Sequence, residues 1–172
     1  MEEFPRWKQS SRVVNFQTIK KLNKQEPLVD VLSEEMNILL KGEKIFTSSY
    51  NDWPIELDAK WSAKKVHLKM SAKVPKFHII FENCTIRKAK LMSIVAGYDN
   101  YKLSGSSSPI SDLFLTSASA KNLLKGKNAS FELSHKNLIY EIQLKRFDKT
   151  SLTNVFILFN KLTQEINELI RN

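Results

Sequence analysis

Hydrophobic and polar residues alternate between Ile55 and Val74, with one change of phase. Apolar side chains occupy every second position up to Ala63, and the alternation resumes one residue out of step at Val66. A period of two gives each run one apolar face and one polar face, as in two antiparallel strands. The slip at Lys64-Lys65 predicts the turn between the two strands.

Two other segments have apolar residues at spacings of three and four, which is typical of amphipathic helices. The first follows Pro27, a residue favoured in the first helical turn, and continues to Leu40 with Lys41-Gly42 closing it. The second starts at a potential cap, Asp148 to Ser151, and covers about five turns to Ile170. Its long apolar face must be buried, and the apolar face of the sheet is the available surface.

Shorter patterns complete the predicted order of elements. The remaining elements are, in chain order, a strand at 44–50, a strand at 77–82, a strand in the ambiguous run 86–98, a short strand at 112–116, a short helix capped at Ser117 or Ser119 and stopped by Gly126, and a hairpin that turns at His135–Asn137. Strands therefore dominate the middle of the chain, and helices flank them.

These elements predict an α+β fold with a single domain over residues 27–172. Short connections favour antiparallel pairing, so we expect a curved antiparallel sheet packed by the long C-terminal amphipathic helix, with an N-terminal helix and a short helix before the last hairpin. This architecture resembles pleckstrin-homology-like barrels and helix-grip folds, which pack a C-terminal helix against a curved sheet. Residues 1–26 lack a clean period and are interpreted as an N-terminal arm, which either docks on a partner or folds back on the sheet.

The charge of the chain is positive and unevenly distributed. The net charge is +9, and residues 60–90 contain nine Lys or Arg against one acid, Glu82. Such a segment attracts anions, whether nucleic acid, acidic lipid headgroups or an acidic protein. The 22 lysines and five arginines disfavour specific base recognition, for which Arg is better suited.

The polar phase of the alternating pair is rich in lysine, whereas the apolar phase contains expected core residues such as Trp61. We therefore predict a basic outer sheet face that binds an anionic partner. The candidate residues are Lys60, Lys64, Lys65, Lys69, Lys73, Lys76, Arg87, Lys88 and Lys90. The alternative interpretation is a solvated face that keeps the protein in solution and protects the sheet edges.

No catalytic or cofactor motif is present in the sequence, which has no Gly-rich phosphate loop, no Rossmann fingerprint and no His-Glu-x-x-His. This favours a non-enzymatic protein without a cofactor. His67, His78 and His135 are far apart in the sequence, so surface histidines are a simpler interpretation than a metal site. The one cysteine, Cys84, excludes an intramolecular disulfide and fits a buried apolar position better than a nucleophile.

The lack of disulfides and the acidic start, Met1-Glu2-Glu3, indicate a cytoplasmic location. No apolar run approaches the about 20 residues that span a bilayer. We expect a non-enzymatic binding module whose basic sheet face contacts an acidic protein or an anionic membrane surface. Two alternatives are a domain that binds nucleic acid non-specifically through the same lysines, and a carrier of an apolar ligand between the sheet and the C-terminal helix.

Overall fold

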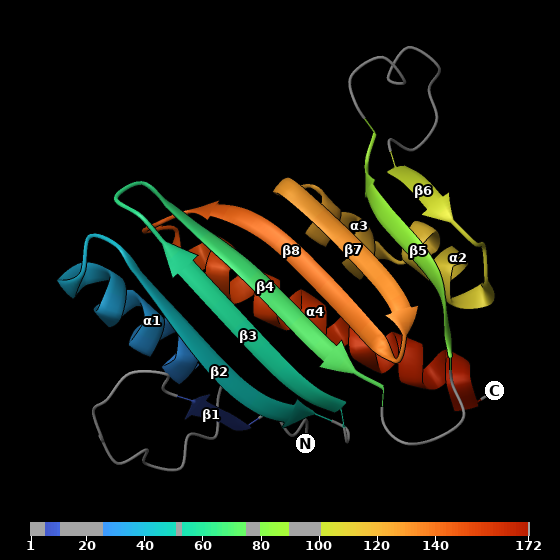
Figure 1. The fold of residues 1–172 in the computed structure, drawn as a ribbon, viewed down its shortest axis with the longest axis horizontal. Coiled ribbons are helices and arrows are strands. Elements are labelled where there is room, and N and C mark those ends of the chain that lie inside the picture. The colour runs from blue at the N-terminus through green and yellow to red at the C-terminus, as the bar shows by residue number, and fades with distance from the viewer. Residues whose placement is uncertain (1–5, 11–25, 51–52, 75–79, 90–100, 172) are drawn as a thin grey trace.

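The computed structural model describes residues 6–10, 26–50, 53–74, 80–89 and 101–171 (Figure 1). Within these ranges the chain forms eight strands, which make one sheet, and four helices. In chain order the elements are β1 (Arg6–Ser10), α1 (Glu26–Ile38), β2 (Gly42–Tyr50), β3 (Trp53–Trp61), β4 (Lys65–Lys73), β5 (Phe81–Lys88), β6 (Tyr101–Gly105), α2 (Pro109–Thr116), α3 (Ala118–Leu124), β7 (Lys127–His135), β8 (Asn137–Lys145) and α4 (Lys149–Arg171).

The strands are arranged in the order β1-β2-β3-β4-β8-β7-β5-β6, and neighbouring strands are antiparallel throughout. The last hairpin inserts between earlier strands, because β8 pairs with β4 and β7 pairs with β5. The expected N-terminal arm contributes the edge strand β1, which pairs with β2. The predicted α+β class, with an antiparallel sheet and a long C-terminal helix, is confirmed.

The alternating run between Ile55 and Val74 forms the β3–β4 hairpin, as its phase slip predicts. Burial alternates strictly along β3, from Trp53 to Trp61, and apolar positions of β4 face the same side. Ala59 lies opposite Leu68, and residues 62–64 make the turn. The side chains of these apolar positions define an inner face of the sheet, and the polar positions define an outer face.

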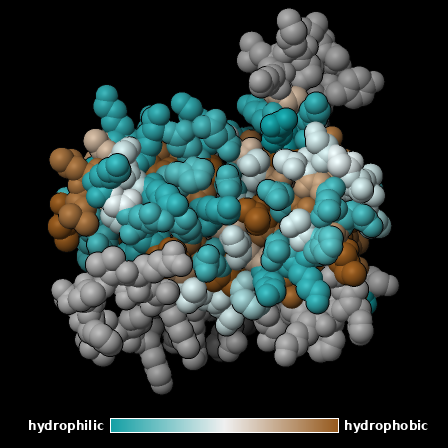
Figure 2. Space-filling model, viewed as in Figure 1, coloured by the Kyte–Doolittle hydropathy of each residue, from teal (hydrophilic) through white to brown (hydrophobic). Residues whose placement is uncertain are grey.

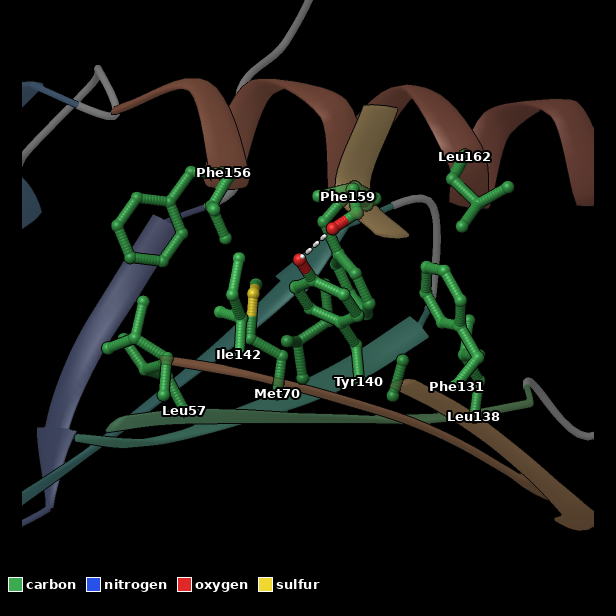
Figure 3. Close-up of a cluster of buried hydrophobic side chains, with 14 of the residues drawn as sticks. Leu57, Met70, Phe131, Leu138, Tyr140, Ile142, Phe156, Phe159 and Leu162 are labelled. Carbon is green, nitrogen blue, oxygen red and sulfur yellow. Dashed lines mark hydrogen bonds between the residues drawn. The ribbon is translucent and has the colours of Figure 1, made fainter. Parts of the chain in front are cut away.

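The inner face is covered by α4, with α2 and α3 beside it (Figure 1). Aromatic rings fill the space between α4 and the sheet: Tyr140 lies 4.7 Å from Phe131 and 6.0 Å from Phe159, measured between ring centroids (Figure 3). The buried Tyr140 hydroxyl donates to the Leu123 carbonyl at 2.9 Å. α1 contributes Leu32 and Met36 to the same core, and its exposed Asp30 pairs with Lys149 on α4 (2.8 Å).

The short strand predicted at 112–116 is wrong, because these residues belong to helix α2. Ser108 and Ser111 form a reciprocal capping box, and Pro109 occupies the first turn. A capping box satisfies two backbone groups at a helix start, and the fixed φ of proline suits that position. Five residues are too few for periodicity to separate strand from helix, so the capping signal was the better guide.

The N-terminal helix is confirmed, but α1 ends at Ile38 and not at the predicted Lys41-Gly42 closure. The chain turns at residues 39–41 so that Gly42 starts β2 against the Trp61 ring. A Cβ atom at Gly42 would come within 2.3 Å of that ring, which explains the need for glycine. The predicted break between the strands at 77–82 and 86–98 is wrong, because β5 runs without a break from Phe81 to Lys88; residues 77–79 and 90–98 of the two predictions lie outside the described residues.

Candidate anion-binding surface

Several of the predicted lysines lie on the outer face of the sheet, but the strand register places acids beside two of them. Lys60 on β3 forms ion pairs with Glu43 on β2 (3.0 Å) and with Asp58 on its own strand (3.1 Å). Hydrogen bonds with Glu43 and then Asp58 raise the pKa of Lys60 above its usual value. Lys69 on β4 lies 3.4 Å from Glu141 on β8. Nearby acids therefore neutralise these two lysines.

Toward the C-terminal end of β4, the next set of outer-face residues that lie opposite one another across the strands contains two acids and no basic residue. It crosses β3, β4, β8 and β7 in register as Glu56, Ser71, Ile139 and Glu132. We call the middle of the outer face the central face, and define it as Glu56, Asp58, Lys69, Ser71, Glu132, Ile139 and Glu141. The central face is mixed in charge, in contrast to the basic face expected from the pattern of β4 alone.

Other candidate residues are dispersed. Lys73 ends β4 opposite Asn137. Arg87 and Lys88 end β5, separated from β4 by β7 and β8. Lys76 and Lys90 lie outside the described residues. Of the predicted set, Lys65 and Arg87 each lie directly opposite a further cation on a neighbouring strand, Lys145 on β8 and Lys102 on β6, and Lys64 directly precedes Lys65.

Three connections of the chain meet at one end of the sheet. They are residues 39–41 between α1 and β2, 62–64 between β3 and β4, and 146–148 between β8 and α4. We call these connections, together with the flanking residues Ile38, Lys65 and Lys145, the three-loop end. Hydrogen bonds from a single side chain hold the connections together.

That side chain belongs to Arg146, which is 4% exposed. Its guanidinium donates to the carbonyl oxygens of Leu39 (2.8 Å), Leu40 (3.2 Å) and Ser62 (3.5 Å), and its backbone N–H donates to the Lys64 carbonyl (3.2 Å). It also lies 4.8 Å from the ring centroid of Phe147. Carbonyls at a helix C-terminus carry partial negative charge and need hydrogen-bond donors. Arg146 supplies these donors, and no described carboxylate pairs with it.

The exposed cations of the three-loop end face one another. Lys65 and Lys145 lie directly opposite on β4 and β8, and both side chains are exposed. Lys41 and Lys64 are also exposed. Over the ranges that the structure describes, none of these four lysines forms an ion pair. Like charges directly opposite on neighbouring strands are destabilising, so this arrangement favours an external anion.

The same end exposes four large apolar side chains. Ile38 is 78% exposed, Leu39 48%, Leu40 75% and Phe147 66%. The prediction that Leu39 and Leu40 continue the buried face of α1 is wrong, because the helix stops before them. Figure 2 shows hydrophobic atoms on the left of the molecule, where α1 ends and β2 begins, next to hydrophilic atoms.

The acid of the three-loop end, Asp148, is occupied as a helix cap. Its carboxylate accepts hydrogen bonds from the backbone N–H of Ser151 (2.9 Å) and from the Ser151 hydroxyl (2.7 Å). These bonds are the main reason that its pKa is lowered, and Lys145 adds a smaller electrostatic contribution. The predicted cap at Asp148–Ser151 is confirmed. Asp148 keeps its negative charge while it caps the helix, so this one carboxylate offsets only part of the charge of the four exposed lysines.

A groove of about 330 Å³ lies beside the three-loop end, between α1 and the connection from β8 to α4. Its walls include Asp30 and Glu34 as well as Arg146 and Lys149. Both signs of charge are present, and Asp30 pairs with Lys149. The groove therefore has no selectivity for anions, and the exposed lysines outside it are the better binding candidates.

The described residues offer little other chemistry. Cys84 is buried, and desolvation raises the pKa of its thiol, which disfavours the reactive thiolate. Within the described ranges, no three His, Cys, Asp or Glu residues come together in a group that could hold a metal ion. His67 is exposed opposite Lys60, and His78 lies outside these ranges. No described helix is long and apolar enough to cross a membrane.

Comparison with protein families, curated proteins and solved structures finds no match for this chain. The site must therefore be interpreted from its own geometry. Sequence reasoning identified Lys64 and Lys65 but missed Lys145, Arg146 and Phe147. The predicted strand alternates as far as Leu144, with its apolar residues at every second position. Continuing this alternation by one residue would have placed Lys145 on the polar, outer face. Nothing in the sequence marks Arg146 as buried.

Proposed function

We propose that this protein is a non-enzymatic binding module that contacts an anionic partner through the three-loop end. The observation that carries this proposal is the cluster of Lys64, Lys65 and Lys145. Two of these lysines face each other across neighbouring strands, and none forms an ion pair among the described residues. The proposal keeps the anionic partner expected from the sequence and moves the contact from the central face to one end of the sheet.

The two alternative functions are less well supported. Lysine is a strongly hydrated point charge that attracts anionic surfaces, whereas arginine is favoured where bases or phosphates are read by bidentate contacts. The described lysine cluster has no exposed arginine within it, which disfavours sequence-specific recognition. Non-specific nucleic-acid binding through the same lysines would make no use of the exposed Leu40 and Phe147 beside them. Carriage of an apolar ligand between sheet and helix is disfavoured because Phe131, Tyr140 and Phe159 occupy that space (Figure 3).

A salt titration on a heparin column tests the proposal with two matched variants. The first replaces Lys64, Lys65 and Lys145 with Gln, and the second replaces Lys60, Lys69 and Lys73 with Gln. Both lose three positive charges from the same sheet, so a difference between them reports position and not net charge. We expect the first variant to reduce the slope of log affinity against log salt by about two, from the counterions no longer released.

The control variant should retain most of the wild-type slope, because two of its lysines are already neutralised by acids. Equal losses in both variants would contradict a localised site. Absence of wild-type retention at low salt would contradict anion binding altogether.

A further inference from the structure

We infer that the three-loop end docks on an anionic phospholipid bilayer, with exposed apolar side chains entering the interface and lysines contacting the headgroups. This inference rests on the proposed function and names its partner. The observation that favours a bilayer over other polyanions is the position of Leu40 and Phe147 beside the lysines. A purely electrostatic partner has no use for exposed apolar side chains at the same place.

The exposed apolar residues of the three-loop end form a group, whereas the other exposed apolar residues are isolated. Ile38, Leu39 and Leu40 are consecutive, and the carbonyls of Leu39 and Leu40 bind the same guanidinium that lies over Phe147. In contrast, Ile80 lies just before β5, and Ile157 and Leu169 are separate positions on α4. Single exposed apolar residues are common on protein surfaces, whereas a group of them indicates an interaction site.

The lysines are placed to meet headgroups while the apolar side chains enter the bilayer. Lys41 follows Leu40 directly, and Lys145 precedes Phe147 by two positions. The carbonyl of Lys64, in the turn between β3 and β4, accepts a hydrogen bond from the backbone of Arg146, and Lys65 follows at the start of β4. Basic and apolar residues combined at one surface are typical of proteins that attach to anionic membranes. The basic residues are attracted to the headgroups, and the apolar residues are buried in the interface.

The connections that would meet the bilayer are held rigidly, which lowers the entropic cost of docking. Arg146 ties residues 39–40 to the β8–α4 connection, and the Trp61 indole N–H also donates to the Leu39 carbonyl at 2.9 Å. The apolar side chains are therefore presented outward before any contact is made. A surface that is already ordered loses less freedom on binding than one that must fold first.

Sedimentation with vesicles tests the inference. The probes are vesicles of phosphatidylcholine alone and of phosphatidylcholine with about one third phosphatidylserine, a fraction chosen to give a strongly anionic surface. We expect wild-type protein to bind the anionic vesicles and to bind neutral vesicles far more weakly. The variant in which Lys64, Lys65 and Lys145 are replaced by Gln should bind anionic vesicles about a hundredfold more weakly, at roughly fivefold per lysine near the surface.

The apolar contribution is tested by the double variant Leu40→Gln and Phe147→Gln, with Ile157→Gln as the control. Ile157 is 46% exposed on α4, outside the three-loop end. We expect the double variant to bind anionic vesicles at least about tenfold more weakly, because two apolar side chains no longer leave water. It should elute from heparin at the wild-type salt concentration, and the control should match wild type in both assays.

The outcomes separate this inference from the proposed function. If wild-type protein is retained by heparin but ignores anionic vesicles, the bilayer inference is overturned and anion binding stands. The same conclusion follows if the double variant binds vesicles as tightly as Ile157→Gln, since the partner then makes only charge contacts, as an acidic protein or nucleic acid would. If wild-type protein binds neither heparin nor vesicles, both proposals fail. Because the substituted side chains are exposed, urea unfolding midpoints close to or above the wild-type value should exclude misfolding as the cause.

Discussion

The central face and the three-loop end contain the same kind of residue in opposite electrostatic surroundings. On the central face, Lys69 lies opposite Glu141, and the adjacent row adds Glu56 and Glu132. At the three-loop end, Lys65 lies opposite Lys145. The difference shows that the number of lysines in a strand does not determine the charge of a surface. The charge of the surface depends on the residues that the neighbouring strands place beside these lysines, and the register of the sheet decides which residues those are.

Replacing the buried cation should produce the largest effect that separates the two regions. We expect Arg146→Met to lower the free energy of unfolding by about 2–3 kcal/mol, because the carbonyls of Leu39 and Leu40 lose a charged donor. The matched substitution Lys69→Met removes an exposed ion pair and should cost less than about 0.5 kcal/mol. Urea unfolding of both variants measures the difference. Equal costs would show that Arg146 does not hold the three connections together.

The helix cap should give the next largest effect. Asp148→Ala is expected to cost about 1 kcal/mol at pH 7, the usual value of an N-cap. The pKa of Asp148 is lowered in the folded state, so its stabilisation is present above the unfolded-state pKa of about 3.9 and is lost as the pH falls through the lower folded-state value. The gap in unfolding free energy between wild type and variant should therefore narrow below about pH 4.

A control for the role of the charge is Asp148→Asn. Asparagine caps helices well but has no charge that titrates in this range. Its stability should lie closer to wild type than that of the alanine variant and should change less with acid. An alanine variant whose deficit stays constant from pH 7 to pH 2 would mean that the cap does not act through the ionised carboxylate.

Reversing the charge of one residue in each region should give the smallest changes in unfolding free energy, and the two changes should be of opposite sign. Lys145→Glu places an acid opposite Lys65, so we expect a gain of about 0.5 kcal/mol in unfolding free energy. Glu141→Lys creates a like-charge pair with Lys69, so we expect a loss of about the same size. Lys145→Glu should at the same time weaken retention on heparin. A loss of stability in both variants would indicate that Lys65 and Lys145 do not repel each other in the folded protein.

The fold could be predicted from sequence where periodic patterns are long. The β3–β4 hairpin and α4 were recognised because each has many repeats of its period. The strand β1 was missed because Arg6–Ser10 does not alternate and owes its conformation to pairing with β2. Helix α2 was mistaken for a strand because it is short, although Ser108, Pro109 and Ser111 mark a helix start.

The candidate site could be predicted only in part, because its properties depend on contacts between distant segments. Lys64 and Lys65 follow from the alternating pattern, but the opposition of Lys65 and Lys145 requires the β4–β8 pairing. The neutralisation of Lys69 by Glu141 requires the same pairing. The exposure of Leu40 requires knowing where α1 ends, and element boundaries are the least certain part of a pattern-based prediction.

The most direct test of the central claim is a titration of ¹⁵N-labelled protein with a short heparin oligosaccharide, followed by amide chemical shifts. We expect the largest shift changes at Lys41, Lys64, Lys65 and Lys145, and we expect the amides of the central face to stay unchanged. Shift changes centred on Lys69 and Ser71, or none at low salt, would contradict it.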